Sequence, residues 1–392
     1  MKKIIIVLNN MKVGGVQKSL YNLLWTIEKQ YDITLLLFGK TGEYVEQLPP
    51  SVKVLECDGP FRYFGLSQSE CKAHFPDFVK RGFFAAVSKF FGRHTAVRLM
   101  LKGQPVLPEH YDCAISYLHN GRREAFYGGT QDFVLNCINA DKKVAFLHCD
   151  YANCGANHPE NNGSMEHFDA IAACSDGCRR VFESVLPHLK EKTVTVRNCH
   201  RLEEIRAMAA QDPVGYDKSR CNVVMVARLS HEKGVERAIE AAADALGQNL
   251  PISLHIVGDG GMREELQTLA RARGIAEQVH FYGEQSNPYR YMKNADLFLL
   301  TSYHEAAPMV IEEAEVLGLP VLTTRTTSSE DMVIRRECGW VCENTQEAIN
   351  QTLTETASDP DALQRFADSL QKRSLLRDNW EAIRSFAALV EC

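Results

Sequence analysis

Short apolar runs alternate with helical patterns along most of this 392-residue chain. The alternation is clearest in the segment 295–324, where the apolar run ADLFLLTS predicts a buried strand and the run VLTT predicts another. Between them, Val310, Ile311, Ala314 and Leu317 are spaced like the buried face of a helix. A strand, a helix and a second strand in this order are the unit of a parallel sheet covered by helices. We therefore predict an α/β fold.

The same alternation runs through two halves of the chain. Strands are expected in the first half at 3–8, 32–38, 113–117, 143–147, 170–174 and 193–196, and in the second half at 222–227, 252–257, 279–282, 295–302 and 321–324. A polar stretch with proline and glycine, 211–220, looks like the junction of the two halves. We predict two Rossmann-like, doubly wound domains, 1–200 and 201–375, that face each other across a ligand-binding cleft.

Composition argues against several classes of protein. A net charge of −6 gives no reason to expect nucleic acid as a partner. No apolar stretch approaches the roughly 18 residues of a membrane span, and the first apolar run leads into a glycine turn, as a first strand does and a signal peptide does not. Thirteen cysteines without a regular framework suit a reducing cytoplasm.

Neither the cysteines nor the carboxylates predict a metal site. Cys149 and Cys154 are five apart, and Cys174 and Cys178 are four apart, unlike the CxxC spacing of zinc and redox sites. We interpret all of them as small buried hydrophobic residues. The Asp-x-Asp at 359–361 contains a proline and precedes a helical pattern, so it is interpreted as a helix cap. We expect no metal and no cofactor.

The segment 61–103 differs from the rest of the chain in charge and aromatic content. It has eight lysines and arginines against Glu70 and Asp77, interleaved with nine phenylalanines and tyrosines. Such a mixture is what an interfacial helix uses to bind anionic lipid. Two interpretations stay open: contact with an anionic membrane surface, or aromatic residues packed into the domain beneath a solvated cationic face.

Two carboxylates flank the predicted helix start after the strand at 295–302. Glu305 lies in the loop, and Glu313 lies eight residues further along, on the helix. The small residues Ala306 and Ala307 let a phosphate approach the backbone, and Pro308 suits the first helical position. Because the two carboxylates are too far apart to touch one group, we expect them to hold two ends of one extended anionic ligand.

Three further loops end at the same edge of the predicted second sheet. The loop after 222–227 carries Arg228 and Lys233, whose charges could neutralise a diphosphate. The glycine loop 258–261 either approaches a nucleotide or only turns the chain. Around the strand at 279–282, an aromatic and apolar place for a nucleotide base is predicted at Tyr282, Glu284 and Tyr289.

These residues resemble the retaining glycosyltransferases of family 4, which have the GT-B fold, and within it the bacterial capsular and exopolysaccharide glycosyltransferases. The family's Arg…Lys-Gly loop matches Arg228, Lys233 and Gly234. Its Glu-x7-Glu motif matches Glu305 and Glu313. The resemblance runs from about 3 to 324 and is strongest in the second half.

The first half carries two more of the family's motifs. Its amino-terminal glycine loop matches Gly14 and Gly15, and a His-x-Asp-Tyr segment after a buried strand matches His148, Asp150 and Tyr151. A single histidine at a strand end is more often structural, but within this pattern we expect His148 to lie near the reacting sugar and the acceptor. The resemblance also implies that a final helix, 376–392, packs back on the first domain.

The resemblance implies a metal-independent hexosyl transfer with retention of anomeric configuration. The donor would be a UDP- or GDP-sugar, and the acceptor a glycan or lipid-linked glycan in cell-surface polysaccharide assembly. We expect a cytoplasmic location, at the inner face of the cell membrane if the segment 61–103 binds anionic lipid. Glu305 and His148 would be catalytic. The donor would be held by Gly14, Gly15, Arg228, Lys233, Glu305, Ala306, Ala307, Pro308, Met309, Val310 and Glu313, with His148, Asp150 and Tyr151 on the acceptor side.

One departure and two alternatives accompany this interpretation. Family members commonly have glycine where this chain has Ala306, so a left-handed backbone there would strain the alanine by about 1 kcal/mol. The fold also occurs in UDP-GlcNAc 2-epimerases, which would make a new nucleotide sugar without an acceptor. A non-catalytic scaffold that retains nucleotide-sugar binding is the second alternative.

Overall fold

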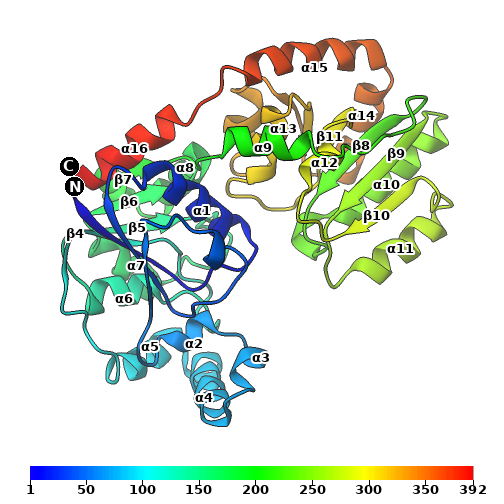
Figure 1. The fold of residues 1–392 in the computed structure, drawn as a ribbon. Helices are drawn as coiled ribbons and strands as arrows, with labels where there is room; N and C mark the ends of the chain where they lie inside the picture. The colour runs from blue at the N-terminus through cyan, green and yellow to red at the C-terminus, as the bar shows by residue number, and fades with distance from the viewer. Residues whose placement is uncertain (392) are drawn as a thin grey trace. The chain divides into compact units, whose positions relative to one another are not determined.

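The computed structural model describes residues 1–391 and contains two parallel sheets, each within its own compact unit (Figure 1). Unit 1 comprises Met1–His200 and the chain from Asn379 on, and unit 2 comprises Arg201–Asp378. The α/β class with two Rossmann-like domains is confirmed. The stretch 211–220 is not the junction, because it lies inside unit 2, where the Tyr216 hydroxyl donates to the Tyr291 carbonyl at 2.8 Å.

The sheet of unit 1 has seven parallel strands in the order β3-β2-β1-β4-β5-β6-β7. The strands are β1 (Lys3–Leu8), β2 (Asp32–Leu37), β3 (Lys53–Glu56), β4 (His110–Ser116), β5 (Asn139–Leu147), β6 (Ala170–Ala173) and β7 (Thr193–Thr195). Side chains of β1 alternate between two cores. Ile5 and Val7 enter one hydrophobic cluster, while Ile4 and Ile6 enter the other. Both faces of the sheet are therefore buried, as expected for a parallel sheet.

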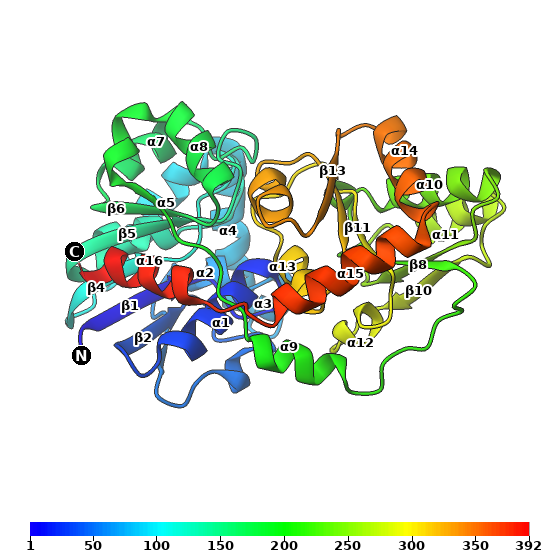
Figure 2. The ribbon, with the colours of Figure 1, turned by 90° about the horizontal axis from the view of Figure 1, so that it is seen from above.

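The helices of unit 1 cover these two faces of the sheet, except that α4 projects away from it (Figure 1). They are α1 (Gly15–Ile27), α2 (Arg62–Gly65), α3 (Gln68–Cys71), α4 (Phe75–Phe91), α5 (Arg93–Leu101), α6 (Thr130–Cys137), α7 (Pro159–Glu166), α8 (Asp176–Val185) and α16 (Trp380–Glu391). Helix α16 lies beside the strands of this sheet (Figure 2) and contributes Phe386 to the cluster that holds Ile4. The Lys2 ammonium caps the end of α16 by donating to the Val390 carbonyl at 3.3 Å.

The sheet of unit 2 has six parallel strands in the order β10-β9-β8-β11-β12-β13. The strands are β8 (Cys221–Val226), β9 (Ile252–Val257), β10 (Val279–Gly283), β11 (Leu297–Leu300), β12 (Val321–Thr324) and β13 (Gly339–Cys342). The helices are α9 (Leu202–Ala209), α10 (Val235–Gly247), α11 (Arg263–Ala272), α12 (Tyr289–Met292), α13 (Met309–Val316), α14 (Gln346–Ala357) and α15 (Pro360–Ser374). Asp359 caps α15, accepting from the Ala362 N–H at 2.9 Å, so the helix-cap interpretation is confirmed.

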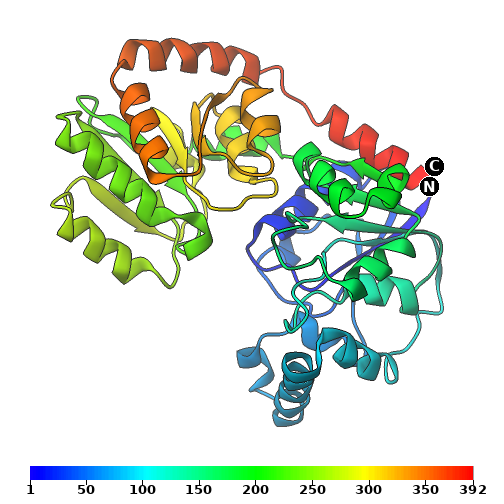
Figure 3. The same cartoon turned by 180° about the vertical axis from the view of Figure 1, so that it is seen from behind.

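The segment 61–103 combines both expected behaviours. Phe61 and Phe64 are buried in the core of unit 1, whereas α4 stands away from the sheet in views from front and back (Figures 1 and 3) and leaves Phe83 and Phe90 exposed. Arg93 is not a surface cation: it is buried and bridges Asp132 at 2.7 Å. Among the described residues, every helix is too short or too polar to cross a membrane.

Candidate active site

The order of strands in the second sheet defines where a ligand would bind. Strand β8 pairs with β9 on one side and with β11 on the other. The strands from β8 to β10 therefore extend the sheet in one direction, and those from β11 on extend it in the opposite direction. In open α/β sheets, ligands bind outside the carboxyl ends of the strands at this switch point. The two loops that leave it are the loop from Arg228 to Gly234 and the loop from Thr301 to Pro308.

An ion pair joins these two loops. The Lys233 ammonium lies 2.6 Å from Glu305 Oε1, and the Ser302 hydroxyl donates to the same oxygen at 2.7 Å. The Glu305 side chain is only 9% exposed, so the pair is shielded from most of the solvent. The structure thus brings together two predicted donor-binding residues that are 72 positions apart in the sequence.

Gly234 makes the close approach of the two loops possible. It has a left-handed backbone, with φ of 58°, at the start of α10. A Cβ there would lie 2.4 Å from the Thr301 carbonyl oxygen, which no side chain could avoid. The Thr301 hydroxyl donates to the Gly234 carbonyl at 2.7 Å and locks the contact. Glycine is therefore required at this position by the backbone conformation and by the second loop.

The loop from Ala306 leads directly into α13. Pro308 precedes the helix as its cap in an extended conformation, so it is not the first helical residue, which is Met309. Ala306 does not have a positive φ, and the expected strain at this alanine is absent. The start of α13 therefore follows directly on the loop that carries Glu305. The backbone N–H groups and the positive dipole end at a helix start favour an anion there.

Glu313 lies in the second turn of α13 with a side chain that is 1% exposed. Its neighbours on the helix form a buried network that the sequence interpretation missed. Arg377 Nη2 lies 2.9 Å from Glu312 and Arg336 Nε lies 2.8 Å from Glu315, and both arginines contact both carboxylates. These ion pairs lie within unit 2 and fasten α13 to the segments that carry Arg336 and Arg377.

Two other predicted elements of this edge, Arg228 and the glycine loop 258–261, make contacts within the protein. The Arg228 side chain is 69% exposed and pairs with Glu232 at 2.8 Å, one helical turn away. The glycine loop after β9 packs on the loop after β8. A Cβ at Gly258 would lie 1.9 Å from the Ala227 carbonyl oxygen, so this glycine has a structural role.

The residues expected around a nucleotide base lie in different places. Tyr289 is buried in the core of unit 2, and its role at a nucleotide base remains a prediction. The Tyr282 hydroxyl lies 3.0 Å from His255 Nδ1, within a cluster of rings in which Tyr216 packs at a tilt against His255 and Tyr291 at a tilt against Tyr282. Glu284 is exposed. Burial, with a contribution from His280, lowers the pKa of His255 to about 3.

The glycine loop of unit 1 follows β1. Gly14 is extended and precedes α1, which begins at Gly15. A Cβ at Gly15 would meet nothing within 4 Å, and one at Gly14 would meet chiefly the flexible end of Gln17. Packing within the protein therefore does not explain these glycines, and the backbone is open to a ligand.

His148 follows β5 and lies against Tyr117 and Phe146, at ring distances of 4.8 and 5.8 Å. Burial, with a contribution from His119, lowers the pKa of His148 to about 3. The imidazole is consequently neutral near pH 7. Its Nε2 is buried and has no hydrogen-bond partner in the described part of the chain.

The other members of the His-x-Asp-Tyr segment are engaged inside unit 1. Asp150 accepts from the Asn153 side chain at 3.0 Å and from the Asn153 backbone N–H at 3.2 Å, which closes a turn. Tyr151 is buried, and its hydroxyl donates to Asn162 at 2.9 Å. Both residues therefore shape the loop that carries His148, and their acceptor-side role remains a prediction.

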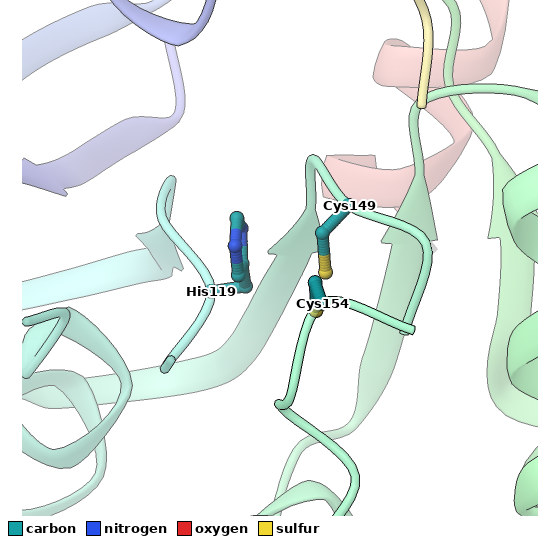
Figure 4. Close-up of side chains that lie close together, drawn as sticks. All are labelled: His119, Cys149 and Cys154. Atoms are coloured by element: carbon teal, nitrogen blue, oxygen red, sulfur yellow. The ribbon is translucent and has the colours of Figure 1, made fainter. Parts of the chain in front are cut away.

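A cluster of three potential metal ligands includes Cys149, which follows His148 in the chain (Figure 4). Ligand atoms of His119, Cys149 and Cys154 all lie within 4.8 Å of one another. A hydrogen bond from Cys149 lowers the pKa of the Cys154 thiol, while burial raises that of Cys149 and lowers that of His119 to about 4. Spacing between the cysteines could not reveal this cluster, because the histidine comes from the loop after the neighbouring strand β4.

Comparisons with known proteins agree with this picture. Residues 211–373 match the family "Glycosyl transferases group 1". Over 129 residues, 31% of this chain and 33% of the relative, the sequence is 36% identical to the lipopolysaccharide glucosyltransferase WaaG of Escherichia coli K12. It is 33% identical over 147 residues, 36% of this chain and 40% of the relative, to the O-antigen biosynthesis glycosyltransferase WbnH of Escherichia coli. The match thus spans well under half the length of these relatives.

The fold of the whole chain also resembles that of solved structures. The crystal structure of Anabaena HepE in complex with UDP and glucose has a TM-score of 0.67 and covers 100% of this chain and 99% of its own, at 16% identity. At this identity the likeness establishes the fold alone, which is that of the GT-B glycosyltransferases. Residues 211–373 therefore form a glycosyltransferase group 1 domain, in a chain with the GT-B fold.

Proposed function

We propose that this protein is a retaining glycosyltransferase of family 4. It transfers a sugar from a UDP- or GDP-sugar to a glycan or lipid-linked glycan in cell-surface polysaccharide assembly. The observation that carries the proposal is the Lys233–Glu305 pair at the switch point of the second sheet, beside the start of α13. The names of the relatives, which include a lipopolysaccharide glucosyltransferase, support the acceptor class.

The charges at this edge suit expulsion of a nucleoside diphosphate. Breaking the glycosidic bond leaves negative charge on the leaving phosphate, which fixed cations and a helix start can stabilise. Lys233 and Arg228 supply the cations, and the backbone of residues 306–310 supplies the helix start. Because these groups take the part that a divalent ion plays elsewhere, the proposed reaction is metal-independent.

Glu305 would hold the sugar hydroxyls while Glu313 would hold the ribose. In the free protein the Glu305 carboxylate is already oriented by Ser302 and Lys233. Such preorganisation lowers the cost of arranging the site at the moment of reaction. Retention would follow from attack on the same face as the leaving phosphate, which would accept the proton of the acceptor hydroxyl.

His148 would act as a neutral hydrogen-bonding group. Its lowered pKa keeps the imidazole uncharged near pH 7, and its buried Nε2 has capacity for a bond to the sugar. A neutral imidazole at this place can orient a hydroxyl without adding a positive charge beside the anomeric carbon.

Helix α4 supports a membrane-surface location on the cytoplasmic side. Phe75, Val79, Phe83 and Phe90 are 50% to 74% exposed and share one face of the helix. With about 100° of rotation per residue, Lys80 and Lys89 flank this face on opposite sides. An apolar stripe between cations fits an anionic bilayer surface. Co-sedimentation with anionic vesicles should be lost in Phe83→Ser/Phe90→Ser and retained in Val106→Ser, which alters an exposed apolar residue elsewhere; equal binding by both variants would refute the location.

A screen of UDP- and GDP-sugars with purified protein tests the activity. We expect donor turnover that is accelerated by a glycan or lipid-linked acceptor and abolished by Glu305→Ala. Glu265→Ala, on the exposed face of α11, is the matched control and should keep full activity. Formation of a new nucleotide sugar without acceptor would instead identify an epimerase. Binding without turnover in any combination would identify a scaffold.

A further inference from the structure

The strongest feature outside the donor edge is the cluster of His119, Cys149 and Cys154 in unit 1 (Figure 4). The histidine lies in the loop after β4, and the two cysteines lie in the loop after β5. These strands are neighbours in the sheet, so their loops leave the same edge side by side. The proposed sugar transfer uses none of the three side chains.

The loop conformation that brings the cysteines together is fixed by other residues. Asp150 accepts from the Asn153 N–H, and the Cys154 N–H donates to the Asp150 carbonyl at 2.9 Å, so the chain turns back toward Cys149. Gly155 then takes a left-handed conformation, and Asn161 donates to the Ala156 carbonyl at 2.9 Å. The cluster is therefore held by a built turn rather than by a chance approach of surface side chains.

We propose that His119, Cys149 and Cys154 bind a soft or borderline divalent metal ion of the zinc class. Zinc prefers thiolate and imidazole ligands at about 2.3 and 2.0 Å in a tetrahedral arrangement, which separates the ligand atoms by roughly 3.5 Å. The three ligand atoms already lie within 4.8 Å of one another. Side-chain rotations that move these atoms by about 1 Å would bring them to the separation that a tetrahedral zinc ion requires. Three protein ligands leave the fourth position to water.

Charge also balances at this site. The ion brings two positive charges, and the two thiols release two protons to solvent as they become thiolates. The site therefore keeps its net charge on binding, which lowers the cost of placing an ion in this partly buried position. Bound metal would tie the loops after β4 and β5 together and would fix the segment that carries His148. The inference does not depend on the proposed transfer reaction.

Cobalt binding to the full chain tests the proposal directly. Protein purified under reducing conditions is stripped with a chelator and titrated with Co²⁺. We expect one ion per chain, with sulfur-to-cobalt charge-transfer and tetrahedral d–d absorption, displaced by Zn²⁺. Cys149→Ser and Cys154→Ser should lose most of the charge-transfer absorption, and His119→Gln should weaken binding at least tenfold. The matched control is Cys178→Ser, which alters another thiol with a neighbouring sulfur, that of Cys174 at 4.0 Å, and should bind like wild type.

Thermal unfolding with and without Zn²⁺ separates lost binding from lost folding. Saturating zinc should raise the Tm of wild type and Cys178→Ser by about 5 °C or more, while the Tm of the Cys149 and Cys154 variants should not move. The proposal is overturned by an absent charge-transfer band, by equal metal binding in the Cys149→Ser and Cys178→Ser proteins, or by a disulfide between Cys149 and Cys154 in the protein isolated with its thiols protected. None of these outcomes bears on sugar transfer.

Discussion

At the carboxyl end of the second sheet two candidate side chains form an ion pair, whereas at the same end of the first sheet two histidines are neutral and desolvated. Lys233 and Glu305 form an ion pair at 2.6 Å, but His148 and His119 have pKa values lowered by burial. Both edges follow parallel strands, so topology alone does not set their electrostatics. The difference suggests that the second edge binds an anionic group and that the first orients hydroxyl groups.

The buried arginines extend this comparison to stability and give the largest expected effect. Arg93→Met should destabilise unit 1 by about 3–5 kcal/mol, because the buried carboxylate of Asp132 loses the arginine that it pairs with. Arg377→Met should cost unit 2 less, roughly 2 kcal/mol, because Arg336 still contacts Glu312 and Glu315. Urea unfolding followed by a probe in each unit measures both values. A larger loss for Arg377→Met would show that the two arginines do not share their carboxylates.

Substitutions by glutamine at the two edges should differ in their effect on turnover. Glu305→Gln keeps the shape of the side chain but removes its charge, and we expect kcat to fall by about 10²–10³. His148→Gln replaces one neutral hydrogen-bonding group by another, and we expect a fall of roughly tenfold. Steady-state kinetics with the preferred donor compare the two. Equal losses would contradict the assignment of charge to one edge and of neutral hydrogen bonding to the other.

His255 makes unit 2 sensitive to acid. Its folded pKa of about 3 lies below the unfolded value near 6.5, so between these values the unfolded chain binds the extra proton. Stability is therefore fully present above pH 6.5 and falls as the pH drops toward 3, by at most about 1.4 kcal/mol per pH unit. His255→Gln should unfold with a flatter pH dependence, measured by urea denaturation from pH 7 to 4.5. The exposed His231→Gln is the control and should keep the wild-type slope.

The exposed cation of the donor loop should contribute least. Arg228 is mostly in solvent and pairs with Glu232, four residues away in the same loop. Such a pair contributes at most about 1 kcal/mol to stability, so Arg228→Ala should leave the fold intact. Because the exposed side chain has to leave Glu232 to reach the donor diphosphate, we expect the donor KM to rise less than tenfold. A loss as large as that of Glu305→Gln would contradict this minor share of Arg228 in stabilising the diphosphate.

The sequence predicted the central strands closely because their apolar runs are buried on both faces. Strands at 3–8, 252–257 and 321–324 have the expected bounds. The edge strands β3 and β13 were missed, since each has only four residues and most of these are half-buried or exposed, so neither shows a buried apolar run. The conformation of 61–103 could not be predicted either, because contacts with the rest of unit 1 determine which of its aromatic side chains are buried in the core.

The donor edge was predictable for a related reason. Glu305, Ala306, Pro308 and the start of α13 are contiguous, so their local pattern was visible before the structure. The His119 cluster was not, because one ligand comes from the loop after β4 and two come from the loop after β5. The buried network around Arg377 joins α13 to a segment 62 to 65 positions away in the sequence, and charge spacing along one helix does not reveal it.

Titration of the protein with UDP and GDP by isothermal calorimetry tests the central claim, that the Lys233–Glu305 edge binds the nucleotide of the donor. One of the two nucleotides should bind wild type and His148→Gln with the same affinity. Lys233→Met should bind it at least tenfold more weakly, because a charged hydrogen bond to phosphate contributes about 1.5–3 kcal/mol. Unchanged affinity in Lys233→Met, or binding of neither nucleotide by wild type, would contradict the account.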